Sequence, residues 1–309
     1  TMAYIFGRIC EGFFQAWGFS ENVKRLGESV VQGTVDIYTR ISTDLLPTPA
    51  RFHYVFNLRD ISKVFQGFLM VKPQSCNSPE EVARLWAHEN ARVFGDRLIN
   101  SQDRDWFLNL LIEISNRYFR LGWTLENVFI KSKINYGDLI KLEAPVKLYE
   151  EIKDRTKLLK VLEDKQEEHN MGSSQTKLSL VFFEDAVEHI LRISRILRQP
   201  RGNAMLIGVG GSGKQSLARL SSFCQGNQVF QIELTKNYNA DSFKGDLMKL
   251  MQKTGVDRTP ITFIFTDSQV VHEVFLEYIN NMLNSGEVPN LFSKKEDLED
   301  IINGVRPYN

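Results

Sequence analysis

Cysteine is scarce in this 309-residue sequence. Its three cysteines, Cys10, Cys76 and Cys224, lie far apart and are odd in number. No C-x-x-C pair is present, so the sequence predicts neither a disulfide framework nor a zinc site. The five histidines show no metal-ligand spacing either. These absences favour a reducing, intracellular compartment.

A net charge of either sign is also lacking. Lys plus Arg and Asp plus Glu both number 38, so the formal net charge is zero. No global basic field draws the chain to nucleic acid or to an anionic membrane, and we expect neither as a partner. The sequence contains no run of about 18 apolar residues, so it predicts no membrane span. The N-terminus lacks the pattern of a signal peptide. Residues 1–14 resemble the middle of a helix, so we expect the chain to be cut out of something larger.

The composition is that of an ordinary globular protein, and the length favours two domains. Residues 1–135 predict an all-α first domain, because apolar side chains recur there at helical spacing. One helix start is well marked. Ser78 stands three residues before Glu81, with a proline at the first helical position, which is a capping box. We expect Ser101 or Asp103 to cap the next helix.

Residues 136–176 predict a linker. Within it, the stretch 147–170 is dense in charge and carries only a thin apolar stripe. We interpret it as a solvated helix between two domains. The alternative is an amphipathic helix that binds a partner. A short flexible break follows at 172–176.

The apolar period changes in the last part of the chain, 177–309. Short segments rich in β-forming residues alternate there with helical ones, which predicts βαβ units and a parallel sheet. The predicted strands are 204–208, 229–234 and 261–266, and the predicted helices are 182–198, 212–224, 240–253 and 270–284.

One glycine-rich segment carries the chemistry. It follows the first predicted strand, opens a helix and contains a complete G-x-x-x-x-G-K core, made of Gly208, Val209, Gly210, Gly211, Ser212, Gly213 and Lys214, followed by Gln215 and Ser216. Glycines let backbone N–H groups curl around phosphate oxygens, the helix N-terminus adds partial positive charge, and Lys214 reaches the β- and γ-phosphates. The segment therefore predicts a nucleotide-binding P-loop. The alternative is a glycine-rich turn with a surface lysine.

The residue after the lysine departs from the pattern. A serine or threonine hydroxyl normally ligates Mg²⁺ at this position, but the chain has Gln215. Its amide oxygen could bind a hard cation with a different reach. Ser216 is rotated by about 100° on the helix, so this turn lacks the usual hydroxyl ligand for Mg²⁺.

An acidic residue at the end of a neighbouring strand completes the predicted site. Asp267 follows the strand 261–266 and is the candidate to hold Mg²⁺ through water. A glutamate follows such an aspartate in hydrolysing members of the wider class and activates the attacking water. Ser268 occupies that place here, and a serine does not accept the proton near neutral pH. The alternative role of Asp267 is a helix N-cap.

These residues resemble the axonemal dynein heavy chains. GVGGSGKQSLARL and FIFTDSQVVHEVFLEYINNMLNSGEVPNLF resemble the P-loop and Walker B segments of the fourth AAA+ module. LLPTPARFHYVFNLRDISKVFQG and LWAHENARVFGDRL resemble the helical lid of the third module. The resemblance extends over nearly the whole chain. It implies an AAA+ parallel sheet with flanking helices over 177–309, preceded by an all-α lid subdomain over 1–135.

The resemblance also implies roles for residues outside the loop. Arg59 would be the sensor-2 arginine of the preceding module, and Val181 and Phe182 would line the adenine pocket. The plainer alternatives are an ion pair of Arg59 with Asp60 or a neighbour, and a core role for Val181 and Phe182. The implied cofactors are ATP or ADP with Mg²⁺. The implied partners are the rest of the heavy-chain ring, other dynein subunits and, through the stalk of a full protein, the microtubule of a cilium axoneme.

The functional hypothesis is a regulatory or structural ATP site with weak or no hydrolysis, and we assign no catalytic residue. The first alternative is a working ATPase module in which another acid replaces the missing base. The second is a non-enzymatic scaffold with an empty pocket, and a P-loop kinase is the remotest. The parent protein would be a microtubule motor ATPase, while this stretch alone would not hydrolyse ATP efficiently.

Overall fold

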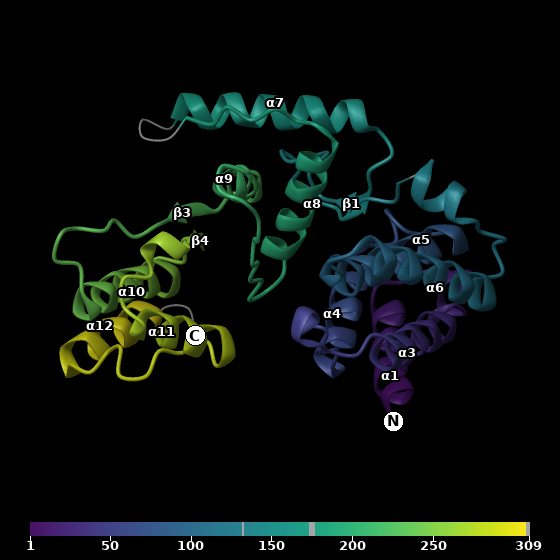
Figure 1. The fold of residues 1–309 in the computed structure, drawn as a ribbon, viewed down its shortest axis with the longest axis horizontal. Helices are drawn as coiled ribbons and strands as arrows, with labels where there is room; N and C mark the ends of the chain where they lie inside the picture. The colour runs from purple at the N-terminus through teal and green to yellow at the C-terminus, as the bar shows by residue number, and fades with distance from the viewer. Residues whose placement is uncertain (132, 173–176, 307–309) are drawn as a thin grey trace. The chain divides into compact units, whose positions relative to one another are not determined.

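The computed structural model describes residues 1–131, 133–172 and 177–306. The chain divides into two compact units, Thr1–Val161 and Leu162–Asn309, which are described separately below (Figure 1). None of the described helices is long and apolar enough to cross a membrane.

The first unit is almost entirely helical, as the apolar spacing of the sequence predicts. Its helices are α1 (Met2–Ala16), α2 (Glu21–Lys24), α3 (Gly27–Asp44), α4 (Leu58–Phe68), α5 (Pro79–Val93) and α6 (Ser101–Phe119). Short turns are η1 (Pro49–Arg51), η2 (Gly95–Arg97) and the π-helical turn η3 (Glu126–Ile130).

A single hydrophobic core joins these helices, with α3 packed against α1 and α6, and α5 against α4 and α6. The fully buried Trp86 lies in it, and its indole N–H donates to Thr34 Oγ1 at 2.9 Å. All four tryptophans of the chain (Trp17, Trp86, Trp106 and Trp123) belong to this unit. Tryptophan fluorescence therefore reports on the first unit alone.

The helix starts show which caps the sequence specifies well. The Ser78 hydroxyl accepts from the N–H of Glu81 at 3.2 Å, and the Glu81 carboxylate accepts from the N–H of Ser78, so the predicted capping box is confirmed. The prediction for α6 is wrong, because Asn100 is its cap and accepts from the N–H of Asp103 at 2.7 Å. Asparagine is as good a cap as serine or aspartate, so the neighbouring candidates could not be ranked from the sequence.

Asp103 instead anchors a half-buried polar cluster. Its carboxylate accepts from Arg51 at 2.9 and 3.1 Å, from the Tyr54 hydroxyl at 3.0 Å and from Asn100 Nδ2 at 2.7 Å. Burial alone would raise the pKa of Asp103, but the three hydrogen-bonding partners outweigh it and hold the pKa below its usual value. The cluster ties η1 and the chain after it to the start of α6.

A second charged pair lies at the start of α4. The Asp60 carboxylate accepts from Arg97 at 2.6 and 3.1 Å, and also from the N–H of Asn57, which caps the helix. The Asp60 side chain is only 2% exposed. Arg97, rather than the adjacent Arg59, is therefore the ion-pair partner of Asp60.

The segment that links the helical part to the P-loop region differs in part from its prediction. β1 (Tyr136–Gly137) and β2 (Glu150–Glu151) form a short antiparallel pair. The charged helix begins only afterwards, as α7 (Arg155–Gly172). The prediction of a helix from residue 147 is therefore wrong for its first turns, where backbone pairing with β1 and the bidentate contact between Glu151 and Arg84 replace helical hydrogen bonds.

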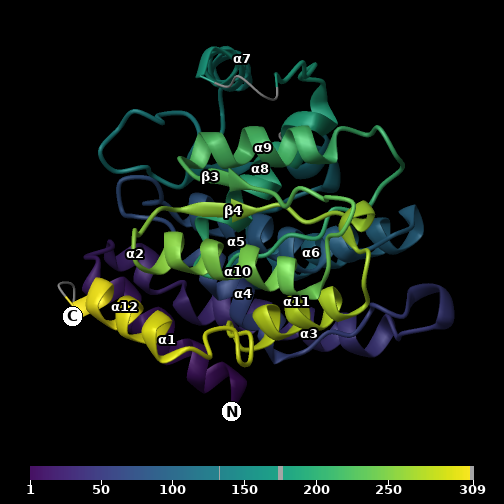
Figure 2. The same ribbon diagram turned by 90° about the vertical axis from the view of Figure 1, so that its left-hand side faces the viewer.

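The second unit alternates helices with two strands. Its elements are α8 (Glu184–Arg198), α9 (Lys214–Gln225), β3 (Gln228–Phe230), α10 (Ala240–Gly255), β4 (Ile261–Phe263), η4 (Asp267–Gln269), α11 (Val274–Asn284) and α12 (Lys295–Val305). β3 and β4 are parallel, with Val229 opposite Thr262. Figure 2 shows α9 on one side of the two strands and α10 on the other.

The core of this unit is aromatic. Phe243 of α10 and Phe275 of α11 are fully buried and stack with ring centroids 4.3 Å apart. Phe230 and Phe263 of the two strands pack against the same cluster. The small parallel sheet with flanking helices that the sequence predicts is confirmed in this form.

The first predicted strand, residues 204–208, is not formed. Met205 and Ile207 are 86% and 85% exposed. A strand needs a neighbour for its N–H and C=O groups, and within the described residues β3 pairs with β4 instead. The apolar run predicts the tendency to form a strand, but a strand forms only where a partner is available.

Candidate nucleotide-binding site

Two left-handed glycines shape the predicted P-loop. Gly211 and Gly213 have φ values of +77° and +78°. A Cβ added at either would meet nothing within 4 Å. The requirement for glycine is therefore one of backbone conformation and not of space, because other residues rarely adopt positive φ. Gly213 is also the N-cap of α9, so the loop leads directly into the helix.

Lys214 closes this loop from inside. Its Nζ donates to the carbonyl oxygens of Gly208 and Val209, both at 2.7 Å, and to Ser212 Oγ at 3.3 Å. The predicted loop residues are thus brought together around one ammonium group. An ammonium group has three donors, and here all three point into the curve of the loop.

The electrostatics of the loop favour an anion. Lys214 is the first residue of α9, where a cation is opposed by the positive end of the helix dipole. The N–H groups of the first helical turn also have no acceptor within the helix. A phosphate group between the lysine and the helix end would satisfy both, which is why helix N-termini bind phosphate readily.

The turn after Lys214 provides a poor set of metal ligands. Gln215 is exposed, and its carboxamide makes no hydrogen bond to the described residues. Ser216 is half-buried one position further along the helix. No group of three or more His, Cys, Asp or Glu side chains that could hold a metal is found among the described residues. The donor set therefore does not fit a Mg²⁺ ion bound directly by the chain.

Asp267 lies in a tight turn shortly after β4. It is exposed, and its Oδ1 accepts from the N–H of Ser268 at 3.0 Å. The N-cap of η4 is Thr266, so the alternative role of Asp267 as the cap is wrong. The Ser268 hydroxyl lies 3.0 Å from that of Thr266. Within the described part of the chain, no hydrogen bond or ion pair joins Asp267 to the loop.

Gln269 holds this turn in place. We did not predict a role for it from the sequence. It is only 6% exposed, its Oε1 accepts from the N–H of Thr266 at 2.9 Å, and its Nε2 donates to the carbonyl of Ile232 at 2.7 Å. The turn that carries Asp267 and Ser268 is thereby fixed to the chain just after β3. A threonine followed three residues later by glutamine is a capping-box pattern, and that signal could have revealed it.

The residues predicted to surround the adenine lie just before α8. Val181 is 78% exposed and Phe182 is half-buried. The alternative of a plain core role is therefore wrong for the exposed Val181. An exposed valine next to a half-buried aromatic ring leaves apolar surface that a planar base could cover.

Arg59 belongs to the first unit and stands in the first turn of α4. Its backbone N–H donates to the capping Asn57 side chain at 2.9 Å. Its guanidinium is exposed and makes no hydrogen bond or ion pair with the described residues. The alternative of an ion pair with Asp60 is therefore wrong, and the guanidinium remains available to another group.

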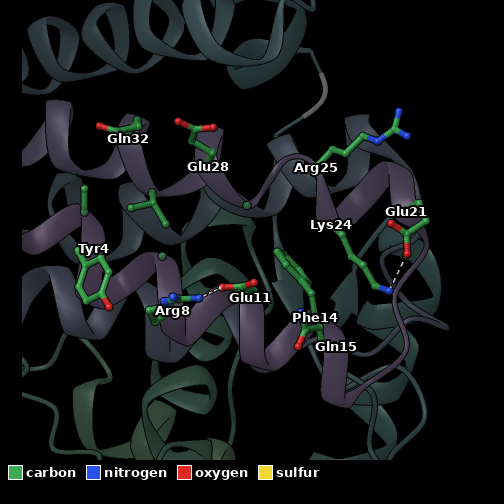
Figure 3. A pocket seen from close by; sticks show the side chains of 14 residues that line it. Tyr4, Arg8, Glu11, Phe14, Gln15, Glu21, Lys24, Arg25, Glu28 and Gln32 are labelled. Carbon is green, nitrogen blue, oxygen red and sulfur yellow. Dashed lines mark hydrogen bonds and ion pairs between the residues drawn. The ribbon is translucent and has the colours of Figure 1, made fainter.

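An open cavity of about 710 Å³ lies elsewhere in the first unit, between α1, α2 and α3 (Figure 3). Two exposed ion pairs, Arg8 with Glu11 and Lys24 with Glu21, lie along it, each at 2.8 Å. Water screens such exposed pairs, so they contribute little to stability. None of the predicted site residues lines this cavity, so it has no part in the candidate site.

Comparison with known proteins supports a helical lid in the first unit and a P-loop region in the second. Residues 178–309 match the family described as the P-loop containing dynein motor region D4, and residues 30–128 match the AAA+ lid domain. The chain is 46% identical over 309 residues to Dynein axonemal heavy chain 6 of Homo sapiens, covering 99% of this chain and 7% of that protein.

Two further relatives show the same pattern. Dynein axonemal heavy chain 1 of Mus musculus is 48% identical over 287 residues, which is 93% of this chain and 7% of the relative. The Dynein-1-beta heavy chain of the flagellar inner arm I1 complex of Chlamydomonas reinhardtii is 40% identical over 290 residues, 94% of this chain and 6% of the relative. The chain thus spans less than a tenth of the curated relatives it matches. It belongs to the axonemal dynein heavy-chain family, as an AAA+ lid followed by the P-loop motor region D4.

Proposed function

We propose that the loop from Gly208 to Ser216 binds ATP or ADP as a regulatory or structural site, with weak or no hydrolysis. One observation carries this proposal: the loop is complete and closed by Lys214, whereas Ser268 occupies the position of the general base. The loop offers positive charge and free N–H groups to phosphates. At the position of the general base, the turn after β4 offers only the hydroxyl of Ser268, which does not activate water.

The environment of Ser268 supports slow hydrolysis. Its hydroxyl is near the Thr266 hydroxyl, and neither accepts a proton at neutral pH. The next carboxylates along the chain, Glu273 and Glu277, are exposed at the start of α11. Loss of a general base typically slows a reaction by ~10²–10⁴-fold. Binding would survive such a loss, because the loop supplies it separately.

The remaining site assignments belong to the same proposal. Val181 and Phe182 would cover the adenine, and Asp267 would hold the Mg²⁺ of the nucleotide through water. Arg59 contacts a nucleotide of the preceding module. We further propose residues 1–135 as the lid of that module, 136–176 as a linker and 177–309 as part of the P-loop subdomain.

The setting follows from the relatives, whose names place them in axonemal dyneins. We propose that the chain acts within the heavy-chain ring of a microtubule motor in the cytoskeleton of a cilium axoneme, with other dynein subunits as partners. The nucleotide site would then regulate or stabilise the ring, and the motor's main hydrolysis would take place at another module.

Two alternatives predict different behaviour of the same site. A working ATPase module would convert bound ATP to ADP, with an acid from elsewhere in the ring acting as base. A scaffold with a degenerate pocket would take up no nucleotide at all. Both differ from the proposal in the identity of the bound nucleotide over time.

The test follows that identity. The chain is loaded with Mg-ATP, freed of unbound nucleotide and denatured at intervals, and the released nucleotide is identified by chromatography. Lys214→Ala is the blank. We expect ATP to persist for hours. Conversion to ADP within minutes would favour the working ATPase, and no retained nucleotide above the blank would favour the scaffold.

A further inference from the structure

We propose that nucleotide affinity at this P-loop is nearly independent of Mg²⁺, because the Gln215 carboxamide stands where a metal-ligating hydroxyl would be and contacts the phosphates itself. This inference rests on the proposed function and assigns a new role to one residue of that site. It concerns affinity for the nucleotide and not its hydrolysis.

The side chain of Gln215 has the chemistry for such a contact. It projects from the first turn of α9, is exposed and makes no hydrogen bond to the described residues. A carboxamide has two N–H donors that a phosphate oxygen can accept. A serine or threonine hydroxyl has a single donor, and in P-loops it uses its lone pairs on the metal. Glutamine therefore exchanges a metal contact for a direct phosphate contact.

Asp267 is the only carboxylate that we assign to Mg²⁺, and it would bind the ion weakly. Asp267 is exposed and already accepts the N–H of Ser268 at one oxygen. No cluster of three acidic, histidine or cysteine side chains supports it in the described ranges 1–131, 133–172 and 177–306. Mg²⁺ retains several waters unless it meets well-placed oxygen ligands. An ion held through water on Asp267 would add little to the affinity.

The loop supplies positive charge of its own to the phosphates. The Lys214 ammonium lies within hydrogen-bonding distance of three loop oxygens, so it stands where the phosphates would approach. The helix N-terminus adds the equivalent of about half an elementary charge. A nucleotide without Mg²⁺ is more negative, so its attraction to these two groups is stronger and offsets the lost metal contacts.

The experiment measures ADP binding to the full chain by titration calorimetry, once in excess Mg²⁺ and once in excess EDTA. The two affinities should agree within about threefold, or roughly 0.7 kcal/mol. For Gln215→Thr, which restores a hydroxyl, Mg²⁺ should tighten binding by about tenfold, or roughly 1.4 kcal/mol. The side chain is exposed, so we expect the variant to fold as the parent does.

Two further variants separate the possible failures. Lys214→Ala should bind about 10–100-fold more weakly in both buffers, and Gln215→Ala should bind more weakly than the parent while remaining insensitive to Mg²⁺. A parent chain that binds ADP only with Mg²⁺ would overturn this inference and leave the proposed function standing. No ADP binding in either buffer would overturn both. Equal insensitivity in Gln215→Thr would overturn the assignment to Gln215.

Discussion

The ammonium nitrogen of Lys214 donates a hydrogen bond of 2.7 Å to the carbonyl oxygen of Gly208, six residues earlier in the chain. The lysine therefore closes its own loop. A bound phosphate must replace these carbonyl acceptors with its own oxygens. Because a phosphate oxygen carries negative charge and a carbonyl oxygen does not, the ammonium group attracts the phosphate more strongly and the exchange favours binding.

Lys214→Ala should weaken ATP and ADP binding by about 10–100-fold, since a hydrogen bond to a charged group contributes roughly 1.5–3 kcal/mol. The matched control is Lys253→Ala, which removes an exposed lysine from the last turn of α10 in the same unit. Titration calorimetry on both variants checks the prediction. Equal affinities in the two variants would show that the loop does not hold the phosphates.

Ser268→Glu tests the missing base. We expect ATP turnover to rise by ~10²-fold or more, because a general base contributes ~10²–10⁴-fold. Ser268→Ala should leave turnover at the level of the parent. Single-turnover release of phosphate is the measurement. A parent that already hydrolyses ATP as fast as Ser268→Glu would point to a substitute acid.

Arg97→Ala should destabilise the first unit by about 2–3 kcal/mol, because it leaves the buried Asp60 carboxylate without its charged partner. Arg59→Ala, one residue before Asp60, should change stability by less than about 0.5 kcal/mol, since its guanidinium has no partner in the described structure. Urea unfolding followed by tryptophan fluorescence compares them. Equal losses would mean that Arg59 also stabilises the fold.

The stability of the first unit should fall in acid through Asp103. Its folded pKa is below the unfolded value of about 3.9, so its contribution is complete above that value and is lost as the pH falls through the folded pKa. Asp103→Asn should be less stable at neutral pH and lose less on acidification. Urea midpoints by tryptophan fluorescence between neutral pH and pH 3 check this. Parallel curves for the two chains would contradict it.

The helices could be predicted well because their signals are local. Ser78 and Glu81 specify the start of α5 by two side-chain contacts within four residues. The cap of α6 could not be chosen among Asn100, Ser101 and Asp103, because all three residue types cap helices almost equally. The role of Asp103 depends on its contact with Arg51, a residue that is distant in the sequence and close only in the fold.

In the candidate site, too, local features could be predicted from the sequence and distant contacts could not. The loop glycines and Lys214 form one contiguous motif, and the structure brings them together. Gln269 makes its decisive contact with Ile232, beyond any short window of sequence. The strand at 204–208 failed for a related reason, because strand formation depends on a neighbour and not on the apolar run itself.

The segment that leads into the loop leaves backbone groups and apolar side chains exposed, and this affects how the chain behaves in solution. Met205, Ile207 and Val209 are exposed next to N–H and C=O groups that no described strand covers. Such a segment can pair with the same segment of another molecule and so start aggregation. Self-association would compete with nucleotide for the neighbourhood of the loop. Apparent affinities should therefore weaken as the protein concentration rises, and dilute samples will report the site most faithfully.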